Sequence, residues 1–132
     1  MTQSTHPRIL IIDDDEAMLE SLAAIVSGGG YLPIEASGGM QGIELALRSP
    51  PHLILCDLLM PVMDGFGVLA RLRSEPATSA IPFVFVTSST VAEDSRTGFL
   101  LGASDYVTKP VDPTALLSLI GQRLGEATGS KK

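Results

Sequence analysis

The stretch RILIIDDDEAM, residues 8–18, begins as an almost unbroken apolar run and ends in four acidic residues, 13–16, followed by the start of a helical pattern. A continuous apolar run of this length is typical of a strand that is buried on both faces. Neighbouring carboxylates repel one another, and their pKa values rise unless a cation lies close to them. The stretch therefore predicts a central strand whose carboxyl end carries a site for positive charge.

Short apolar runs alternate with helical periodicity along the rest of the chain. Further strands are expected at residues 31–36, 52–56, 82–86 and 105–108. Helices are expected between them: Met40, Ile43 and Leu47 mark the second, and the fourth, roughly 91–101, is the weakest because Thr, Ser and Gly interrupt it. The last helix is expected to use Asp112 as its N-cap and Pro113 as its first residue.

This alternation predicts an α/β domain in which helices cover both faces of a parallel sheet. The strand order 2-1-3-4-5 fits, because it places the second strand, with Pro33, and the short fifth strand at the two edges. The expected fold is a flavodoxin-like, doubly wound (βα)5 arrangement with a five-stranded sheet.

The chain has 132 residues, which suits one domain at residues 8–125, an N-terminal tail at 1–7 and a C-terminal tail or linker start at 126–132. Its net charge is −6 and its basic residues form no stripe, so direct binding of nucleic acid is not expected. No apolar run is long enough to cross a membrane and no leader-like pattern opens the chain. With a single cysteine, these features lead us to expect a cytoplasmic protein.

Chemically active residues follow the predicted strands. Asp13 and Asp14 come after the first strand, Asp57 after the third, Thr87 after the core of the fourth and Lys109 after the fifth. Each has an ordinary structural explanation by itself, such as a helix cap or a surface charge. Together they are expected to meet, because ligands of open parallel sheets lie beyond the carboxyl ends of the strands.

Three carboxylates without His or Cys suit a hard cation such as Mg²⁺. A hydroxyl and a lysine facing a metal-bound carboxylate are suited to holding a phosphoryl group. An aspartate nucleophile at such a site would form an aspartyl phosphate. The rim of the predicted sheet is therefore a candidate site of phosphoryl transfer.

Four segments, in this order and at these separations, resemble the receiver domain of two-component response regulators, and most closely its stand-alone chemotaxis type. They are IIDDDE (11–16), CDLLMPVMDG (56–65), VTSS (86–89) and DYVTKP (105–110). The resemblance covers about residues 8–125 and is specific only when the segments are taken together. It implies a signalling switch that catalyses only its own phosphorylation and dephosphorylation.

The resemblance also implies roles for individual residues. Asp57 would be the phosphoacceptor, with Mg²⁺ or Mn²⁺ held by Asp57, Asp13, Asp14 and the backbone carbonyl of Leu59. Asp14 would be a more direct ligand than Asp13. The phosphoryl donor would be a histidine kinase or a phosphotransfer domain.

On the same resemblance, Thr87 would hydrogen-bond the phosphoryl group and Lys109 would pair with it, next to a cis bond between Lys109 and Pro110. Thr87 and Tyr106 would form the switch that reshapes the face made by the fourth helix, the fifth strand and the fifth helix. A downstream effector protein or domain would bind that face, and a homodimer formed on phosphorylation is compatible with it.

Some positions depart from the family pattern or carry no prediction of their own. Leu59 and Ser89 stand where the family's residues flank the path of attacking water, and neither is a strong general base. Val111 replaces a Phe common in winged-helix transcription regulators, which disfavours that branch. Cys56 is expected to be a core thiol, and His6 and His52 show no ligand spacing.

Two other functions remain as alternatives. A haloacid-dehalogenase-like phosphohydrolase would use Asp13 as its nucleophile and matches the Asp13-x-Asp15 spacing, but Ala17 does not fit its pattern. A receiver-like module that binds proteins without phosphorylation would be expected to have lost an acid or the lysine. The nucleophile, Asp13 or Asp57, discriminates between hydrolase and receiver.

Overall fold

A computed structural model of the chain describes residues 6–127, in which strands and helices alternate from end to end. The strands are β1 (Arg8–Ile12), β2 (Leu32–Ala36), β3 (Leu53–Cys56), β4 (Phe83–Thr87) and β5 (Asp105–Thr108). The helices are α1 (Glu16–Gly28), α2 (Gly39–Arg48), α3 (Gly65–Arg73), α4 (Ala92–Leu100) and α5 (Pro113–Ala127).

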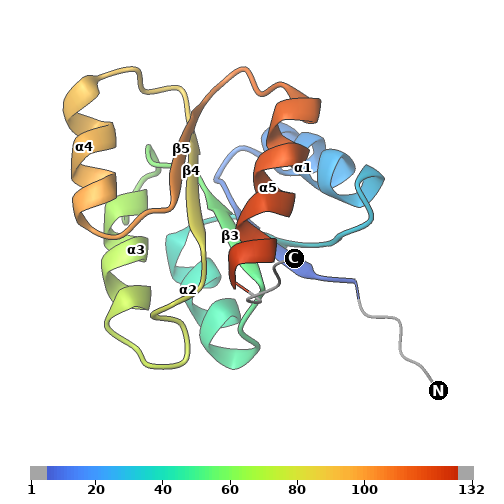
Figure 1. The fold of residues 1–132 in the computed structure, drawn as a ribbon. Helices are drawn as coiled ribbons and strands as arrows, with labels where there is room; N and C mark the ends of the chain where they lie inside the picture. The colour runs from blue at the N-terminus through green and yellow to red at the C-terminus, as the bar shows by residue number, and fades with distance from the viewer. Residues whose placement is uncertain (1–5, 128–132) are drawn as a thin grey trace.

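All strands pair in parallel in one sheet of order β2-β1-β3-β4-β5, which confirms the predicted topology (Figure 1). Pro33 lies on edge strand β2, where its missing N–H costs the sheet least. The last helix, α5, continues to Ala127, past the expected domain end at residue 125. Of the expected tails at residues 1–7 and 126–132, residues 1–5 and 128–132 lie outside the described part of the chain.

Three strand starts differ from the prediction by one residue: β3 begins at Leu53 instead of residue 52, and local hydrogen bonds explain the later starts of β2 and β4. The N–H of Tyr31 donates to the carbonyl of Val26 at 3.0 Å and so belongs to the end of α1, which delays β2 to Leu32. Pro82 has no N–H, although its carbonyl accepts from Ile54 at 2.9 Å, so β4 starts at Phe83 and ends at Thr87.

Helices cover both faces of the sheet, because alternate strand residues point to opposite sides. On one face α1 and α5 pack against odd-numbered residues of β1 and β3; on the other, α2 and α3 pack against even-numbered residues of the same strands. Cys56 is fully buried on the α2 and α3 face, as predicted. In Figure 1 α4 lies on the same side of the sheet as α3.

The helix ends show which predicted caps form. The Asp15 carboxylate accepts the N–H groups of Ala17 and Met18 at the start of α1, and that of Asp112 accepts the Thr114 N–H at the start of α5. The start of α4 differs, since its N-cap residue Val91 has no side chain that can accept a hydrogen bond. The weakest predicted helix is thus the least conventionally capped of these three.

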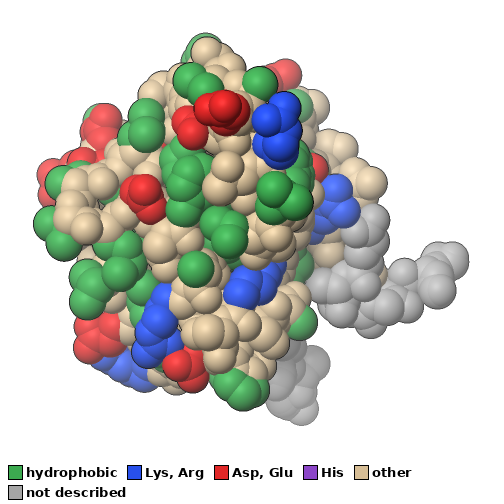
Figure 2. All heavy atoms as spheres, turned by 90° about the vertical axis from the view of Figure 1, so that its left-hand side faces the viewer, with side chains coloured by type: hydrophobic (Ala, Val, Ile, Leu, Met, Phe, Trp, Pro, Cys, Tyr) green, Lys and Arg blue, Asp and Glu red, His purple; other side chains and the backbone are tan. Residues whose placement is uncertain are grey.

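Exposed hydrophobic side chains gather around α4. Figure 2 views the molecule from the α4 side, where green side chains interrupt the polar surface. Those at α4 and its ends are Val91, Phe99, Leu100 and Leu101. Among residues 6–127, no helix has the length and apolar character required to span a membrane.

Candidate functional site

The carboxyl ends of β1 and β3 place two aspartates side by side. Ile12 and Cys56 are paired in the sheet, so Asp13 and Asp57 follow at the same level. Their backbone N–H groups extend the ladder, because Asp57 donates to Ile12 at 2.9 Å and Asp13 donates to Ala36 at 3.1 Å. The sheet therefore fixes the backbone positions of both aspartates.

Asp14 completes a group of three acids. One carboxylate oxygen from each of Asp13, Asp14 and Asp57 lies within 4.8 Å of the others. Asp13 and Asp57 are 1% and 6% exposed, whereas Asp14 is exposed to solvent. The predicted acidic cluster is therefore assembled, with two buried members and one open to solvent.

Lys109 follows the edge strand β5 and reaches these acids along the same rim of the sheet. Its Nζ lies 3.0 Å from Asp13 Oδ2 and 3.6 Å from Asp57 Oδ2. The Lys109–Pro110 peptide bond is cis, as expected. One ammonium group thus faces two buried carboxylates, which leaves the cluster with an excess of negative charge.

The pKa of Asp13 is raised above its ordinary value, mainly because burial disfavours the charged form, and the charge of Asp57 raises it further. Hydrogen bonds from the Asp15 N–H and from Lys109 act in the opposite direction. The net rise means that ionised Asp13 costs stability in the folded protein, so a cation bound here would stabilise the folded state.

Thr87 is the last residue of β4 and is fully buried. Its hydroxyl oxygen accepts the N–H of Ser89 at 3.3 Å, and its carbonyl accepts the N–H of Lys109 at 2.8 Å. The second bond joins the ends of β4 and β5 beside the acids, so Thr87 and Lys109 lie on one rim as predicted.

Tyr106, on β5, is partly buried against Phe85, with ring centroids 5.9 Å apart. Its hydroxyl donates a hydrogen bond to the carbonyl of Ser89 at 3.1 Å. Ser89 therefore contacts both residues of the predicted switch, accepting from Tyr106 and donating to Thr87.

The loop between β3 and α3 closes tightly over Asp57. The N–H of Leu59 approaches Asp57 Oδ1 at 3.4 Å, while the Leu59 side chain is 55% exposed. A Cβ at Gly65 would lie 2.5 Å from the Asp57 carbonyl oxygen, so only glycine permits this approach. Asp64 caps α3 by accepting the Gly67 N–H at 3.0 Å, which fixes the other end of the loop.

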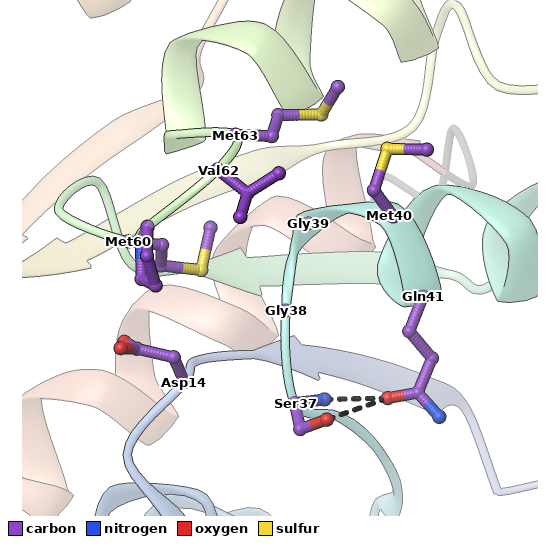
Figure 3. Close-up of a pocket in the computed structure, with 10 residues that line it drawn as sticks. Asp14, Ser37, Gly38, Gly39, Met40, Gln41, Met60, Val62 and Met63 are labelled. Carbon is purple, nitrogen blue, oxygen red and sulfur yellow. Dashed lines mark hydrogen bonds between the residues drawn. The ribbon is translucent and has the colours of Figure 1, made fainter.

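An open cleft of about 280 Å³ adjoins the acids on the α2 side (Figure 3). Asp14 lies at its edge, and its apolar wall includes Met40, Met60, Val62 and Met63. Met40 is 62% exposed, so this marker of the second helix lines the cleft instead of joining the core. Hydrogen bonds from Ser37 to Gln41 Oε1 hold the cleft's α2 side.

The donor set suits a divalent cation of the Mg²⁺ type. It consists of carboxylate oxygens, which hard cations prefer, and the exposed Asp14 leaves room for the waters that Mg²⁺ retains. His6 and His52 lie elsewhere, since His6 Nδ1 contacts the Gly30 carbonyl and His52 Nδ1 accepts the Arg8 N–H.

Comparison with known proteins identifies this arrangement. The family model described as the response regulator receiver domain matches residues 9–121. The chain belongs to the response regulator receiver family. It is thus a receiver domain of two-component systems, and receivers of this kind interact with histidine kinases and effectors.

Two curated receiver-containing proteins illustrate the range of relatives. Protein PilH of Pseudomonas aeruginosa is 38% identical over 113 residues, which are 86% of this chain and 93% of PilH. The DNA-binding dual master transcriptional regulator RpaA of Synechocystis is 40% identical over 114 residues, but the chain spans only 47% of its length. Similar receivers thus occur both almost alone and within longer proteins.

Solved structures agree with the fold. A CheY-like receiver domain protein from Methanospirillum hungatei has a TM-score of 0.89 and 30% identity, with 96% of this chain and all of that chain covered. A response regulator from Chloroflexus aurantiacus has a TM-score of 0.87, also at 30% identity.

The sequence patterns missed the contacts around Ser89. Its hydroxyl donates to Asp94 Oδ2 at 2.6 Å and accepts the Val91 N–H at 3.3 Å. Asp94 stands out in the sequence only as an acid in the first turn of a weak helix, a position that a solvated charge fills equally well. No spacing rule joins it to Ser89, because the contact depends on the course of the loop between them.

Proposed function

We propose that this receiver domain accepts a phosphoryl group on Asp57 from the phosphohistidine of a histidine kinase or a phosphotransfer domain. The observation that carries the proposal is the position of Lys109 Nζ, 3.6 Å from Asp57 Oδ2 and beside the acidic group of Asp13, Asp14 and Asp57. An acceptor carboxylate, an ammonium group and a set of cation ligands are the components that phosphoryl transfer requires.

The transfer balances without any oxidant or further reactant. An oxygen of the Asp57 carboxylate forms a bond to phosphorus as the bond between phosphorus and the donor's imidazole nitrogen breaks. The electron pair of the broken bond remains on that nitrogen. The product is an aspartyl phosphate, and water later cleaves it to restore the carboxylate.

Mg²⁺ or Mn²⁺, held by Asp13, Asp14, Asp57 and the Leu59 carbonyl, would supply positive charge opposite the phosphoryl oxygens. In the same proposal Lys109 pairs with a phosphoryl oxygen, and the buried Thr87 hydroxyl donates a hydrogen bond to another. The Leu59 side chain is apolar and 55% exposed, so it offers no base to activate water.

The output is proposed to act through the face made by α4, β5 and α5, with Thr87 and Tyr106 as the switch. Tyr106 links this face to the site through its hydrogen bond to the Ser89 carbonyl. An effector protein or domain would bind there, and a homodimer formed on phosphorylation would use exposed apolar residues such as Phe99 and Leu100.

The geometry favours Asp57 over Asp13 as the nucleophile. Asp13 is held by short hydrogen bonds at both carboxylate oxygens, Oδ1 from the Asp15 N–H at 2.9 Å and Oδ2 from Lys109 at 3.0 Å. The corresponding contacts of Asp57 are longer, at 3.4 Å from the Leu59 N–H and 3.6 Å from Lys109, so its oxygens are freer to react. Asp15 caps α1, so the Asp13-x-Asp15 pair does not present two reactive acids to one substrate. Both findings count against the haloacid-dehalogenase-like alternative, which needs Asp13.

The test is intact mass after incubation with Mg²⁺ and acetyl phosphate, with and without EDTA. Wild-type protein is expected to gain one phosphoryl group that requires Mg²⁺, and Asp57→Asn is expected to gain none. Glu16→Gln is the matched control, because it neutralises an exposed acid of the same rim and should retain the adduct.

Absence of any adduct in the wild type, together with no binding of beryllofluoride, would replace the proposal by a module that binds proteins without phosphorylation. An adduct that survives in Asp57→Asn and disappears in Asp13→Asn would support the hydrolase alternative instead.

A further inference from the structure

Ser89 is the point where the phosphoryl site, the switch tyrosine and α4 meet. Its N–H donates to Thr87 Oγ1 at 3.3 Å and its carbonyl accepts from Tyr106 at 3.1 Å. Its hydroxyl donates to Asp94 Oδ2 at 2.6 Å while accepting the Val91 N–H at 3.3 Å. Every polar group of this nearly buried residue is therefore used.

The hydrogen bond between Ser89 and Asp94 attaches the first turn of α4 to Ser89. Asp94 lies in that turn, and the Ser89 hydroxyl stands between its carboxylate and the backbone at the helix start. A hydrogen bond to a charged carboxylate is stronger than one between neutral groups. This pair therefore fixes the start of α4 by holding the N–H of Val91 and the carboxylate of Asp94, although no side chain caps the N–H groups of the first turn.

The rest of α4 is held at two other points. Gly98, the only buried residue of this helix, lies against Phe85; a Cβ there would be 2.9 Å from Phe85 Cε2. Just beyond the helix, the Gly102 carbonyl accepts from Arg73 Nη2 at 2.9 Å, and Arg73 also donates to the Ile81 carbonyl. The far end of α4 is thus tied to α3, and its near end is tied to the site through Ser89.

We propose that Ser89 and Asp94 are positioning residues that carry the phosphorylation state of the site to α4. This inference rests on the proposed function. A shift of Thr87 toward a phosphoryl group on Asp57 moves the acceptor of the Ser89 N–H, and the Ser89 hydroxyl passes that shift to Asp94. Because Gly102 is held by Arg73, α4 responds by moving at its first turn.

The experiment measures amide hydrogen exchange in α4, at residues 95–99, with and without Mg²⁺ and beryllofluoride as the phosphoryl analogue. Fluorine NMR of the bound beryllofluoride reports independently that the site is filled. The variants are Ser89→Ala and Asp94→Ala, which remove the donor and the acceptor of the same hydrogen bond.

Two further variants distinguish the specific hydrogen bond between Ser89 and Asp94 from a general effect of an acid in the first turn of α4. Glu93→Ala removes an exposed acid from the same turn, with the same change in charge and the same replacement residue. Asp94→Asn keeps an oxygen that can accept from the Ser89 hydroxyl, so it tests rescue by a conservative change.

In wild-type protein and in Glu93→Ala, beryllofluoride is expected to change α4 exchange rates by about threefold or more. In Ser89→Ala and Asp94→Ala the site should still fill, but the change at α4 should shrink at least about threefold. Asp94→Asn should recover most of the change in α4 exchange rates that beryllofluoride causes in wild-type protein.

An equal response of α4 in Asp94→Ala and wild type, with beryllofluoride bound in both, would overturn the coupling and leave the proposed function intact. Equal loss in Glu93→Ala would also overturn it, since any first-turn acid would then suffice. A wild type that binds no beryllofluoride would overturn the proposed function together with the coupling.

Discussion

The β3–α3 loop and helix α4 both pack against Phe85, but the loop also meets backbone atoms there and α4 meets side chains. On one side of this buried ring, Gly65 brings the β3–α3 loop within van der Waals reach of the ring and of the backbone at Asp57. On the other side, Gly98 brings α4 against the same ring, but no backbone lies in its way. Glycine permits a close approach in both cases. Only Gly65, however, approaches backbone atoms of the site's floor, by which we mean the ends of β1 and β3 with Asp13 and Asp57.

The difference separates the part of the domain that does chemistry from the part that responds to it. Asp13 and Asp57 directly follow the central strands β1 and β3 and are buried, so their backbone cannot move without disturbing the sheet. By contrast, α4 buries a single residue and is anchored at its start by one pair of side chains. A response element of this kind needs low local stability.

The largest effect is expected from Gly65→Ala. The new Cβ would lie 2.5 Å from the Asp57 carbonyl oxygen and 2.9 Å from Leu58 Cα, and neither backbone atom can yield easily. We expect a loss of about 2–3 kcal/mol in the free energy of unfolding, measured by urea denaturation. A loss below about 0.5 kcal/mol would show that the floor of the site is as adaptable as α4.

Asp13→Asn tests the electrostatics of the same floor. Because the pKa of Asp13 is raised, its ionised form destabilises the folded protein. This destabilisation is complete above the raised pKa and is lost as pH falls from there to below the ordinary pKa of an aspartate. Near pH 7 without Mg²⁺, the variant should therefore be more stable than wild type, and this difference should shrink at acidic pH.

The same variant should bind Mg²⁺ at least about tenfold more weakly, because one ligand and one negative charge are lost. Urea denaturation with and without Mg²⁺ measures both effects. A variant that is less stable and binds Mg²⁺ as well as wild type does would contradict the repulsion inferred among the three acids.

A smaller gain in stability is expected from Val62→Gly, a change in the loop between β3 and α3. Val62 has φ of 70°, a left-handed conformation that is unfavourable for a β-branched residue, and its side chain is fully exposed. Replacement by glycine should raise the free energy of unfolding by about 0.5–1 kcal/mol, after the entropic cost of glycine is subtracted. Val62→Ala, which keeps the conformational restriction, is the control and should bring a smaller gain.

Gly98→Ala completes the comparison and should have the smallest effect on stability. The new methyl group presses on the Phe85 ring, but α4 can shift, and alanine improves the helix by about 1 kcal/mol. A net change within about 1 kcal/mol is expected in urea denaturation. A loss as large as that of Gly65→Ala would mean that α4 is fixed as firmly as the strands.

Much of the fold and of the site's floor could be predicted from the sequence for one reason. Continuous apolar runs mark buried parallel strands, and whatever follows them must lie on a common rim, as Asp13, Asp57 and Lys109 do. Caps such as Asp15 were equally accessible, because they depend only on local spacing.

What could not be predicted depends on the course of loops. The contact between Ser89 and Asp94 depends on the course of residues 89–94, and Met40 is exposed where it lines the open cleft. Neither feature has a period or a motif. The one-residue shifts of β2 and β4 likewise reflect single backbone hydrogen bonds at Tyr31 and Pro82.

The most direct test of the account is to locate the phosphoryl group on the chain. Protein treated with acetyl phosphate and Mg²⁺ is reduced with borohydride, which converts an aspartyl phosphate to homoserine, and peptide mass spectrometry then identifies the altered residue. The account predicts homoserine at position 57 alone, and none in a sample prepared with EDTA. Homoserine at position 13, or at no aspartate of a protein that carries the adduct, would contradict it.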